Sequence, residues 1–295
     1  MSKTLVILNP AARSTRAGGE ASFIESLPGG AEVALTSGSG EARTLAAGAV
    51  ERGYSTVVAA GGDGTINEVV NGLAGSGATL GVLPIGTMNV FAAELGIPSA
   101  LAAAWEVIVR GHVREIDLAC ANEQYFVQLA GVGLDAQVVK ETSWSMKRNF
   151  GPLSYVVAAA QIAARKPPRL EVRYDGNVTE GCFVLIGNGR YYGGPFNFFQ
   201  KARVDDGRLD ALVFQKMGHL DIVRYLGNML MGSHTELKDV TYFQAKEIQI
   251  TSDEAVPVEV DGELATELPV TFGVSDRKLR VLVPASGFPE RGMLG

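Results

Sequence analysis

Residues 56–72 read TVVAAGGDGTINEVVNG, and this stretch decides the fold. The run 56–60 is made of β-branched and small residues, which is typical of a buried strand. A glycine-rich turn at 61–64 follows at once, and a helical pattern occupies 65–74. A strand that leads through a turn into a helix is the repeating unit of a parallel α/β sheet.

The flanking sequence repeats this unit. Short apolar runs at 4–8, 31–36 and 80–83 are typical of strands, and helical patterns follow at about 17–27 and at 41–52. Strands that alternate with helices at this spacing predict a parallel sheet covered by helices. We therefore expect residues 1–117 to form a parallel-sheet α/β domain.

The pattern changes after Asp117, where most apolar runs become β-rich and are separated by turn residues. These runs are 125–130, 170–174, 182–186, 209–214, 246–251, 256–260, 268–274 and 279–283. Two helical patterns, near 151–165 and 219–231, interrupt them. This alternation predicts a mainly antiparallel β-sandwich over 118–283, with a tail at 284–295 that returns to the first domain.

Composition excludes several function classes. The 295 residues carry a net charge of −6, which gives no support to nucleic-acid binding. Two distant cysteines and three histidines lack metal-ligand spacing, and a reducing cytoplasm is the expected location. The longest apolar run, 155–164, is half of what a membrane span requires. The motifs of P-loop, dinucleotide-binding, zinc-protease and α/β-hydrolase sites are missing from the sequence.

The turn at 61–64 has the chemistry of an anion site. Successive glycines expose backbone N–H groups, and the helix start adds partial positive charge. Asp63 would repel a phosphate there unless a cation such as Mg²⁺ bridged them. Thr65 and Glu68 have the spacing of a capping box. The plain alternative is a tight strand-to-helix turn without a ligand.

Two other loops follow strands and would lie at the same edge of the sheet. The first begins at Asn9-Pro10, and the second is the segment 84–89, which reads PIGTMN. Asn-Pro and Pro-x-Gly are common turn formers, so each loop is unremarkable alone. The carboxyl edge of a parallel sheet is where such folds bind ligands, and three loops there favour a binding site.

These motifs, with others in the same order, resemble the bacterial diacylglycerol-kinase-like lipid kinases, which share a catalytic domain with sphingosine and ceramide kinases. The matching segments are NPAAR at 9–13, GGDGTINEVVNG at 61–72, PIGTMNVFAAELGIP at 84–98, DLACANEQYFVQLAGVGLDA at 117–136, GNGRYYGG at 187–194, ARVDDGRLD at 202–210 and VDGE at 260–263. GGDGT alone is shared with NAD kinases and, more distantly, with phosphofructokinases, whereas the whole ordered set is far more specific.

The resemblance implies transfer of the γ-phosphoryl group of ATP, with Mg²⁺, to the hydroxyl of a diacylglycerol-like lipid. It implies that Glu263 is the general base and that Asp63 is also catalytic. It further implies that the nucleotide contacts Asn9, Thr36, Gly61, Gly62, Asp63, Gly64, Thr65, Ile66, Asn67, Glu68, Gly86, Thr87 and Asn89. Without the resemblance, Asp261-Gly262-Glu263 is only a turn between two strands.

A second Mg²⁺ site is also implied, in the loop 203–208. Asp206 would supply a carboxylate and Arg203 and Arg208 their carbonyls, with Asp117 in the same network. An Asp-Gly turn without metal explains the loop equally well. One residue departs from the family pattern, because Val90 stands where an Asp is usual. If that Asp orients the nucleotide or the substrate, the activity or substrate preference of this chain is expected to differ from that of close relatives.

Membrane access is expected to be peripheral, at the inner membrane face, where the lipid alcohol lies. The segment 144–150, followed by Arg165, Lys166 and Arg169, mixes aromatic, apolar and cationic residues that suit an interface. An amphipathic helix covering the sandwich is the alternative. The loop 191–199 lines an acyl groove or packs the core.

Several points stay open. The sequence does not specify the acceptor lipid, whether the nucleotide is ATP or GTP, or the oligomeric state. A homodimer is the common default. Two rival functions also remain. One is a small-molecule kinase of the NAD kinase type, and the other is a nucleotide-binding protein that has lost catalysis.

Overall fold

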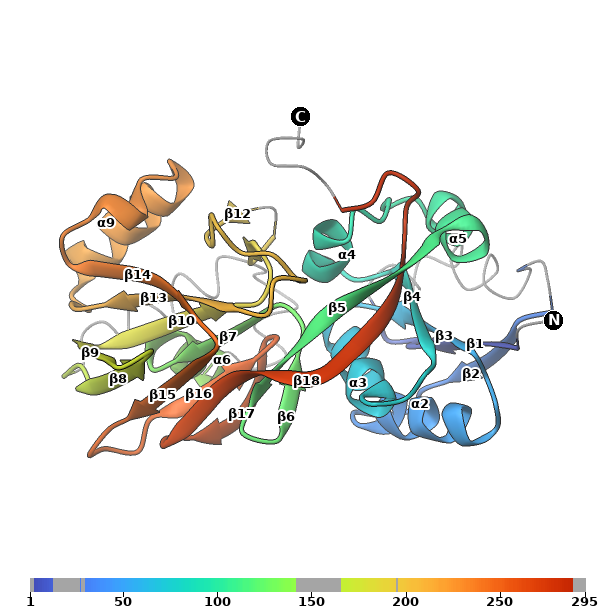
Figure 1. Ribbon diagram of the computed structural model, residues 1–295, viewed down its shortest axis with the longest axis horizontal. Helices are drawn as coiled ribbons and strands as arrows, with labels where there is room; N and C mark the ends of the chain where they lie inside the picture. Colours follow the sequence, from blue (N-terminus) through green and yellow to red (C-terminus); the bar gives the residue numbers. More distant parts are fainter. Residues whose placement is uncertain (1–2, 13–26, 28–29, 142–165, 195, 289–295) are drawn as a thin grey trace. The chain divides into compact units, whose positions relative to one another are not determined.

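The computed structural model describes residues 3–12, 27, 30–141, 166–194 and 196–288. The chain divides into two compact units (Figure 1). Unit 1 contains Met1–Leu118, Gly193–Pro195 and Ser275–Gly295, and unit 2 contains Ala119–Tyr192 and Phe196–Val274. The chain returns to unit 1 at Ser275, before the expected boundary at 283/284. The reason is that one long strand, β18 (Val270–Val283), has its second half in unit 1.

Unit 1 is built on a parallel sheet. Its strands are β1 (Thr4–Leu8), β2 (Glu32–Leu35), β3 (Thr56–Gly61) and β4 (Thr79–Pro84). They lie in the order β2-β1-β3-β4, and the second half of β18 pairs in parallel with β4. The order reverses between β1 and β3, which makes that point the topological switch of the sheet.

Helices cover the sheet of unit 1 on both faces. They are α2 (Glu41–Glu51), α3 (Asp63–Leu73), α4 (Val90–Glu94) and α5 (Leu101–Arg110). Figure 1 shows α2 and α3 on one side of the sheet and α5 on the other. Helices α2 and α3 approach closely, because a Cβ at Gly72 would lie 2.7 Å from the Cβ of Ala46. Both faces are thus buried, as parallel sheets require.

Unit 2 contains two antiparallel sheets. The first has the order β14-β13-β10-β7-β16-β17. Its strands are β7 (Leu129–Val132), β10 (Phe183–Gly187), β13 (Leu209–Phe214), β14 (Val240–Ala245), β16 (Pro257–Val260) and β17 (Glu263–Glu267).

The second sheet of unit 2 packs on the first. It contains the first half of β18 with β15 (Glu247–Thr251), β8 (Leu170–Tyr174) and β9 (Asn177–Gly181), and the end of β5 (His112–Ala121) with β6 (Gln124–Phe126). Buried side chains of both sheets, among them Val184, Val258 and Phe272, form one core. The unit is therefore a β-sandwich.

Two helices cover the outer face of the first sheet, α6 (Leu134–Glu141) and α9 (His219–Leu230). Alternate residues of β10 point to opposite sides: Val184 and Ile186 enter the sandwich core, and Phe183 and Leu185 enter a second core beneath the helices. The smaller elements are β11 (Tyr191–Tyr192), β12 (Phe196–Asn197) and the 3₁₀ turn His234–Glu236.

The predicted fold class, a parallel α/β domain followed by an antiparallel β-sandwich, is confirmed. Two strand predictions need correction. The run 125–130 is not one strand, because β6 ends at Phe126 and β7 begins at Leu129. The runs 268–274 and 279–283 are instead one continuous strand, β18. The helix expected near 151–165 and the segment 144–150 lie outside the described residues.

Candidate active site

Asn9 joins the two strands at the switch point. It follows β1 directly, and its backbone N–H donates to the carbonyl of Ala60 in β3 at 3.0 Å. Its Nδ2 donates to Oγ1 of Thr65 in α3, also at 3.0 Å. Thr36 follows β2 at the same edge, where it is buried and its N–H donates to Leu8. Asn9 and Thr36, two predicted nucleotide ligands, thus lie at the carboxyl ends of adjacent strands, and Asn9 bonds to a third, Thr65.

The glycine loops that follow β3 and β4 touch each other through their backbones. The N–H of Ile85 donates to the carbonyl of Gly61 at 3.0 Å. A Cβ on Gly86 would lie 2.5 Å from the Cα of Gly62, and a Cβ on Gly61 would lie 2.5 Å from the Cβ of Thr65. A side chain would fit at neither Gly61 nor Gly86, so both glycines are required by close approach.

Helix α3 begins at Asp63, earlier than predicted, and the capping box is wrong. No side chain of the described residues caps its N-terminus, which starts from Gly62. Glu68 instead reaches across to α2, where its two carboxylate oxygens accept the N–H groups of Gly40 at 2.8 Å and Ala42 at 3.0 Å. The N–H groups at the first turn of a helix are the kind of backbone groups that bind anions.

Asp63 caps a different helix. Its Oδ1 accepts the N–H of Phe91, in the first turn of α4, at 3.2 Å. Burial raises the pKa of Asp63 above its usual range, and the N–H groups of Phe91, Val90 and Asn89 partly offset that rise. The backbone at Val90 is thus part of the Asp63 contact, while its side chain is buried.

Asn89 fixes the loop between β4 and α4. Its backbone is left-handed, with φ at 50°. Its Oδ1 accepts the N–H of Gly86 at 2.8 Å, and its Nδ2 donates to the carbonyl of the same residue at 2.9 Å. The neighbouring Thr87 is exposed and so available to a ligand. In α3, by contrast, the Ile66 side chain is fully buried in the core and Asn67 bonds to Asn71.

Glu263 lies in unit 2 at the tip of a β-hairpin. It is the first residue of β17 and is exposed. The two central residues of the turn, Asp261 and Gly262, have φ values of 47° and 85°, which is typical of a type I′ hairpin turn. The Asp261 carboxylate accepts the N–H groups of Val127, Gln128 and Leu129 at 2.9, 3.0 and 3.0 Å. These bonds explain why the predicted strand 125–130 is broken.

Two acidic residues beside this hairpin were not predicted. Glu259 of β16 is fully buried, and its Oε2 accepts the N–H of Gly262 at 2.7 Å. Asp135 of α6 faces Glu259 and accepts a hydrogen bond from the hydroxyl of Tyr192. The alternation in 256–260 would place Glu259 on a solvent face, but α6 covers that face. Only the packing of α6 reveals this pair.

The chain matches the diacylglycerol kinase catalytic domain over residues 3–121 and the YegS C-terminal NAD kinase beta sandwich-like domain over residues 128–283. A diacylglycerol kinase of Staphylococcus aureus (strain JH9) is 34% identical over 250 residues, which cover 83% of this chain and 79% of that relative. The chain belongs to the diacylglycerol kinase family.

Solved structures of this kinase family have the same fold. A candidate diacylglycerol kinase from Bacillus anthracis strain Sterne superposes with a TM-score of 0.82 at 28% identity, covering 97% of this chain and 96% of that one. A further diacylglycerol kinase structure from the same strain gives 0.74 at 26% identity, with 97% and 98% covered. Among the described residues, no helix is both long and apolar enough to cross a bilayer.

The predicted metal residues of the family member fall in both units. In unit 2, Asp206 Oδ1 accepts the N–H of Arg208 at 3.0 Å, and Arg203 pairs with Asp205. In unit 1, the buried Asp117 pairs with Lys278. The structure therefore does not place Asp117 and Asp206 in one unit.

The donor chemistry of the loop 203–208 fits a hard cation. A carboxylate with backbone carbonyls is the kind of oxygen set that Mg²⁺ accepts when waters complete its shell. Within the described parts of the chain, no three His, Cys, Asp or Glu side chains gather closely enough to hold a metal by themselves. Carbonyls or waters would therefore have to complete such a site.

Proposed function

We propose that this kinase transfers the γ-phosphoryl group of ATP to the hydroxyl of a diacylglycerol-like lipid alcohol. One observation carries the proposal: the loops after β1, β3 and β4 converge at the switch point of a sheet within the segment that matches the diacylglycerol kinase catalytic domain. Parallel sheets bind nucleotides at such points. Membership of a kinase family also implies a nucleoside triphosphate and, typically, a divalent metal.

In the proposed mechanism, the glycine loops and the first turn of α3 bind the phosphates. Backbone N–H groups at a helix start stabilise phosphate charge, and close backbone contact leaves no side chain in the way. Bound Mg²⁺ would neutralise further charge on the phosphates. Thr87 and Asn9 would bond the nucleotide from the two flanking loops.

Glu263 is the proposed general base. It would accept the proton of the lipid hydroxyl as the hydroxyl oxygen forms its bond to the γ-phosphorus and the bond to the β-phosphate oxygen breaks, releasing ADP. Its exposure leaves the carboxylate accessible to an acceptor. The turn behind it is held by Asp261, which limits its freedom.

We also propose peripheral membrane contact through α9. This helix buries Ile222, Tyr225 and Met229 against unit 2. Its opposite arc exposes five apolar side chains, which we call the α9 ridge: Leu220 at 86%, Val223 at 68%, Leu226 at 41%, Leu230 at 64% and Met231 at 85% exposure. A lipid substrate makes the bilayer the natural occupant of such a face.

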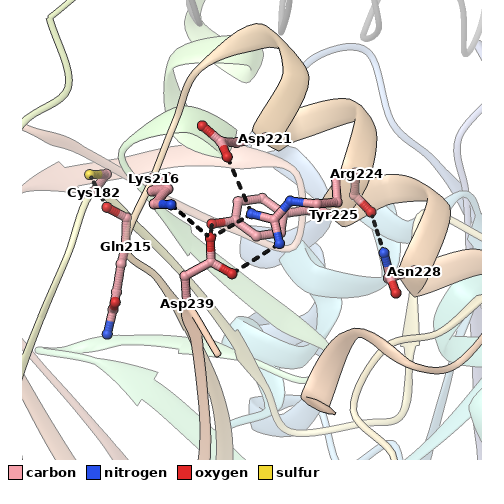
Figure 2. Close-up of polar contacts among 8 residues, drawn as sticks. All are labelled: Cys182, Gln215, Lys216, Asp221, Arg224, Tyr225, Asn228 and Asp239. Carbon is pink, nitrogen blue, oxygen red and sulfur yellow. Dashed lines mark hydrogen bonds and ion pairs between the residues drawn. The ribbon is translucent and has the colours of Figure 1, made fainter. Parts of the chain in front are cut away.

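The polar side of α9 anchors the helix to the unit. Figure 2 shows Arg224 reaching Asp239, with an Nη2–Oδ2 distance of 2.5 Å, while Asp221 and Tyr225 complete the network. One face of α9 is therefore buried against unit 2, and a second face carries the ion pairs. The third face, the α9 ridge, is exposed within the part of the chain that the structure describes, and it is the face that we propose enters a membrane.

The function is tested with γ-labelled ATP, Mg²⁺ and mixed micelles that each carry one lipid alcohol: diacylglycerol, phosphatidylglycerol, ceramide or undecaprenol. A parallel sample contains NAD and no lipid, because the C-terminal match is to an NAD kinase-like sandwich. We expect label in one lipid. Label in NAD alone, or nucleotide binding without transfer to any acceptor, would contradict the proposal.

A further inference from the structure

Two carboxyl groups meet beneath the hairpin that carries Glu263. Glu259 projects from β16 and Asp135 from α6, and both lie over Gly131 of β7. A Cβ at Gly131 would contact the Asp135 carboxylate and would lie 2.8 Å from Oε1 of Glu259. The glycine therefore makes room for the pair.

The surroundings of Glu259 do not support two negative charges. Its side chain is fully buried, and no hydrogen-bond donor in the described part of the chain reaches Oε1. The titratable groups facing the pair are Tyr192 from β11, which donates to Asp135, and Asp261 in the turn. Burial first, and the Asp135 carboxylate second, raise the pKa of Glu259 well above its usual range.

A proton on Glu259 gives its Oε1 a hydrogen-bond partner. Oε1 then becomes a donor to Asp135, and Oε2 continues to accept the N–H of Gly262 at 2.7 Å. Glu259 thereby links α6 to the turn on one side. Asp261 holds the same turn on the other side, through the three N–H groups at 127–129.

We propose that a carboxyl–carboxylate hydrogen bond between Glu259 and Asp135 holds the hairpin that presents Glu263, which makes Glu259 a positioning residue for phosphoryl transfer. The inference rests on the proposed function for its kinetic consequence. Its structural part, the locked turn, stands independently of which acceptor is used.

The pair also predicts a response to rising pH. A carboxyl group whose pKa is higher in the folded than in the unfolded protein contributes its full stabilisation at pH values below the unfolded pKa. This stabilisation is lost as the pH rises through the folded pKa. Once both carboxyls are ionised, they repel each other and the turn loosens. Glu259→Gln keeps a donor for Asp135 and an acceptor for Gly262 but cannot ionise, so it should remove this response.

The experiment compares full-length wild type with Glu259→Gln, Glu259→Ala and, as a control on the same hairpin, Glu267→Gln at an exposed site. Two quantities are measured across pH: kcat and KM with the lipid that wild type phosphorylates, and amide hydrogen exchange at Gly262.

For Glu259→Ala we expect kcat to fall about tenfold, with the KM for ATP unchanged and fast exchange at Gly262. Glu259→Gln should stay within about threefold of wild type, keep Gly262 protected and retain activity to higher pH. Glu267→Gln should match wild type.

Two results would overturn the inference. One is protection of Gly262 in Glu259→Ala equal to that of wild type. The other is a Glu259→Gln variant as impaired as Glu259→Ala, because that would mean Glu259 acts as a charged group. If wild type phosphorylates no lipid, the proposed function fails, but the exchange measurement still decides whether Glu259 locks the turn.

Discussion

Asp63, the first residue of α3, accepts the backbone N–H of Phe91, so its carboxylate supports α4 in addition to the catalytic role that the family resemblance implies for it. The two roles can be separated by substitution. Asparagine keeps an oxygen that accepts the N–H but has no negative charge. Alanine removes the acceptor as well.

The first prediction uses this difference. Asp63→Ala should lower the free energy of unfolding by about 1 kcal/mol, the usual cost of a lost helix cap, and Asp63→Asn by clearly less. Urea unfolding measures both. Equal stability of the alanine variant and wild type would show that Asp63 does not cap α4.

Glu68 gives the second prediction at this scale. Its carboxylate accepts two N–H groups at the start of α2, so Glu68→Ala should cost about 2 kcal/mol of unfolding free energy. Glu51→Ala, at the exposed last residue of α2, is the matched control and should be neutral or slightly stabilising, because a negative charge there opposes the helix dipole. If both variants unfold at the same urea concentration, the cap contributes nothing.

Among the helices, α9 is bound to the rest of unit 2 by polar contacts with one carboxylate, that of Asp239. Arg224, with the hydroxyl of Tyr225, lowers the pKa of Asp239 to about 2. A lowered pKa means that the pair stabilises the fold above the unfolded pKa of Asp and that this contribution is lost as pH falls from about 4 towards 2.

The third prediction follows from that pair. Asp239→Asn should destabilise the protein by about 1 kcal/mol at pH 7, and the difference from wild type should shrink as pH approaches 2. Thermal unfolding from pH 7 to 2 measures it. A difference that stays constant over this range would contradict the assigned role of the charge.

The α9 ridge gives the fourth prediction. Leu220→Asp combined with Leu230→Asp should weaken binding to phosphatidylglycerol-containing vesicles at least tenfold, because burial of a leucine in an apolar phase is worth about 1.5–3 kcal/mol. Val178→Ser, at an exposed valine of β9, is the control. Turnover of a short-chain, water-soluble diacylglycerol should be unchanged in both. Undiminished vesicle binding of the double variant would exclude the ridge as the contact.

For the molecule as a whole, local patterns predicted most strands, and distant partners explain the failures. The run 56–60 is almost entirely buried and became β3, as its composition indicates. The break after Phe126 depends on Asp261, more than 130 residues away. Glu68 has the spacing of a capping residue for its own helix, yet it bonds to α2 across 28 residues. No local pattern contains such contacts.

The candidate site divides in the same way. Asn9 follows β1 directly, Gly61 ends β3 and Gly86 lies two residues after the end of β4, so their convergence could be predicted from the rule for parallel sheets. Asp135 and Glu259 lie more than 120 residues apart, on a helix and a strand whose packing no motif indicates. Their contact became visible only in the folded unit.

We propose that Glu263 acts as the base in phosphoryl transfer to a lipid hydroxyl. The most direct test measures, in the same preparation, ATP binding and label transfer from γ-labelled ATP to the preferred lipid for wild type and Glu263→Gln. We predict unchanged ATP affinity in the variant, with transfer reduced by about a hundredfold or more. Transfer at the wild-type rate by Glu263→Gln would contradict the account, because the proton of the acceptor hydroxyl would then go to another group.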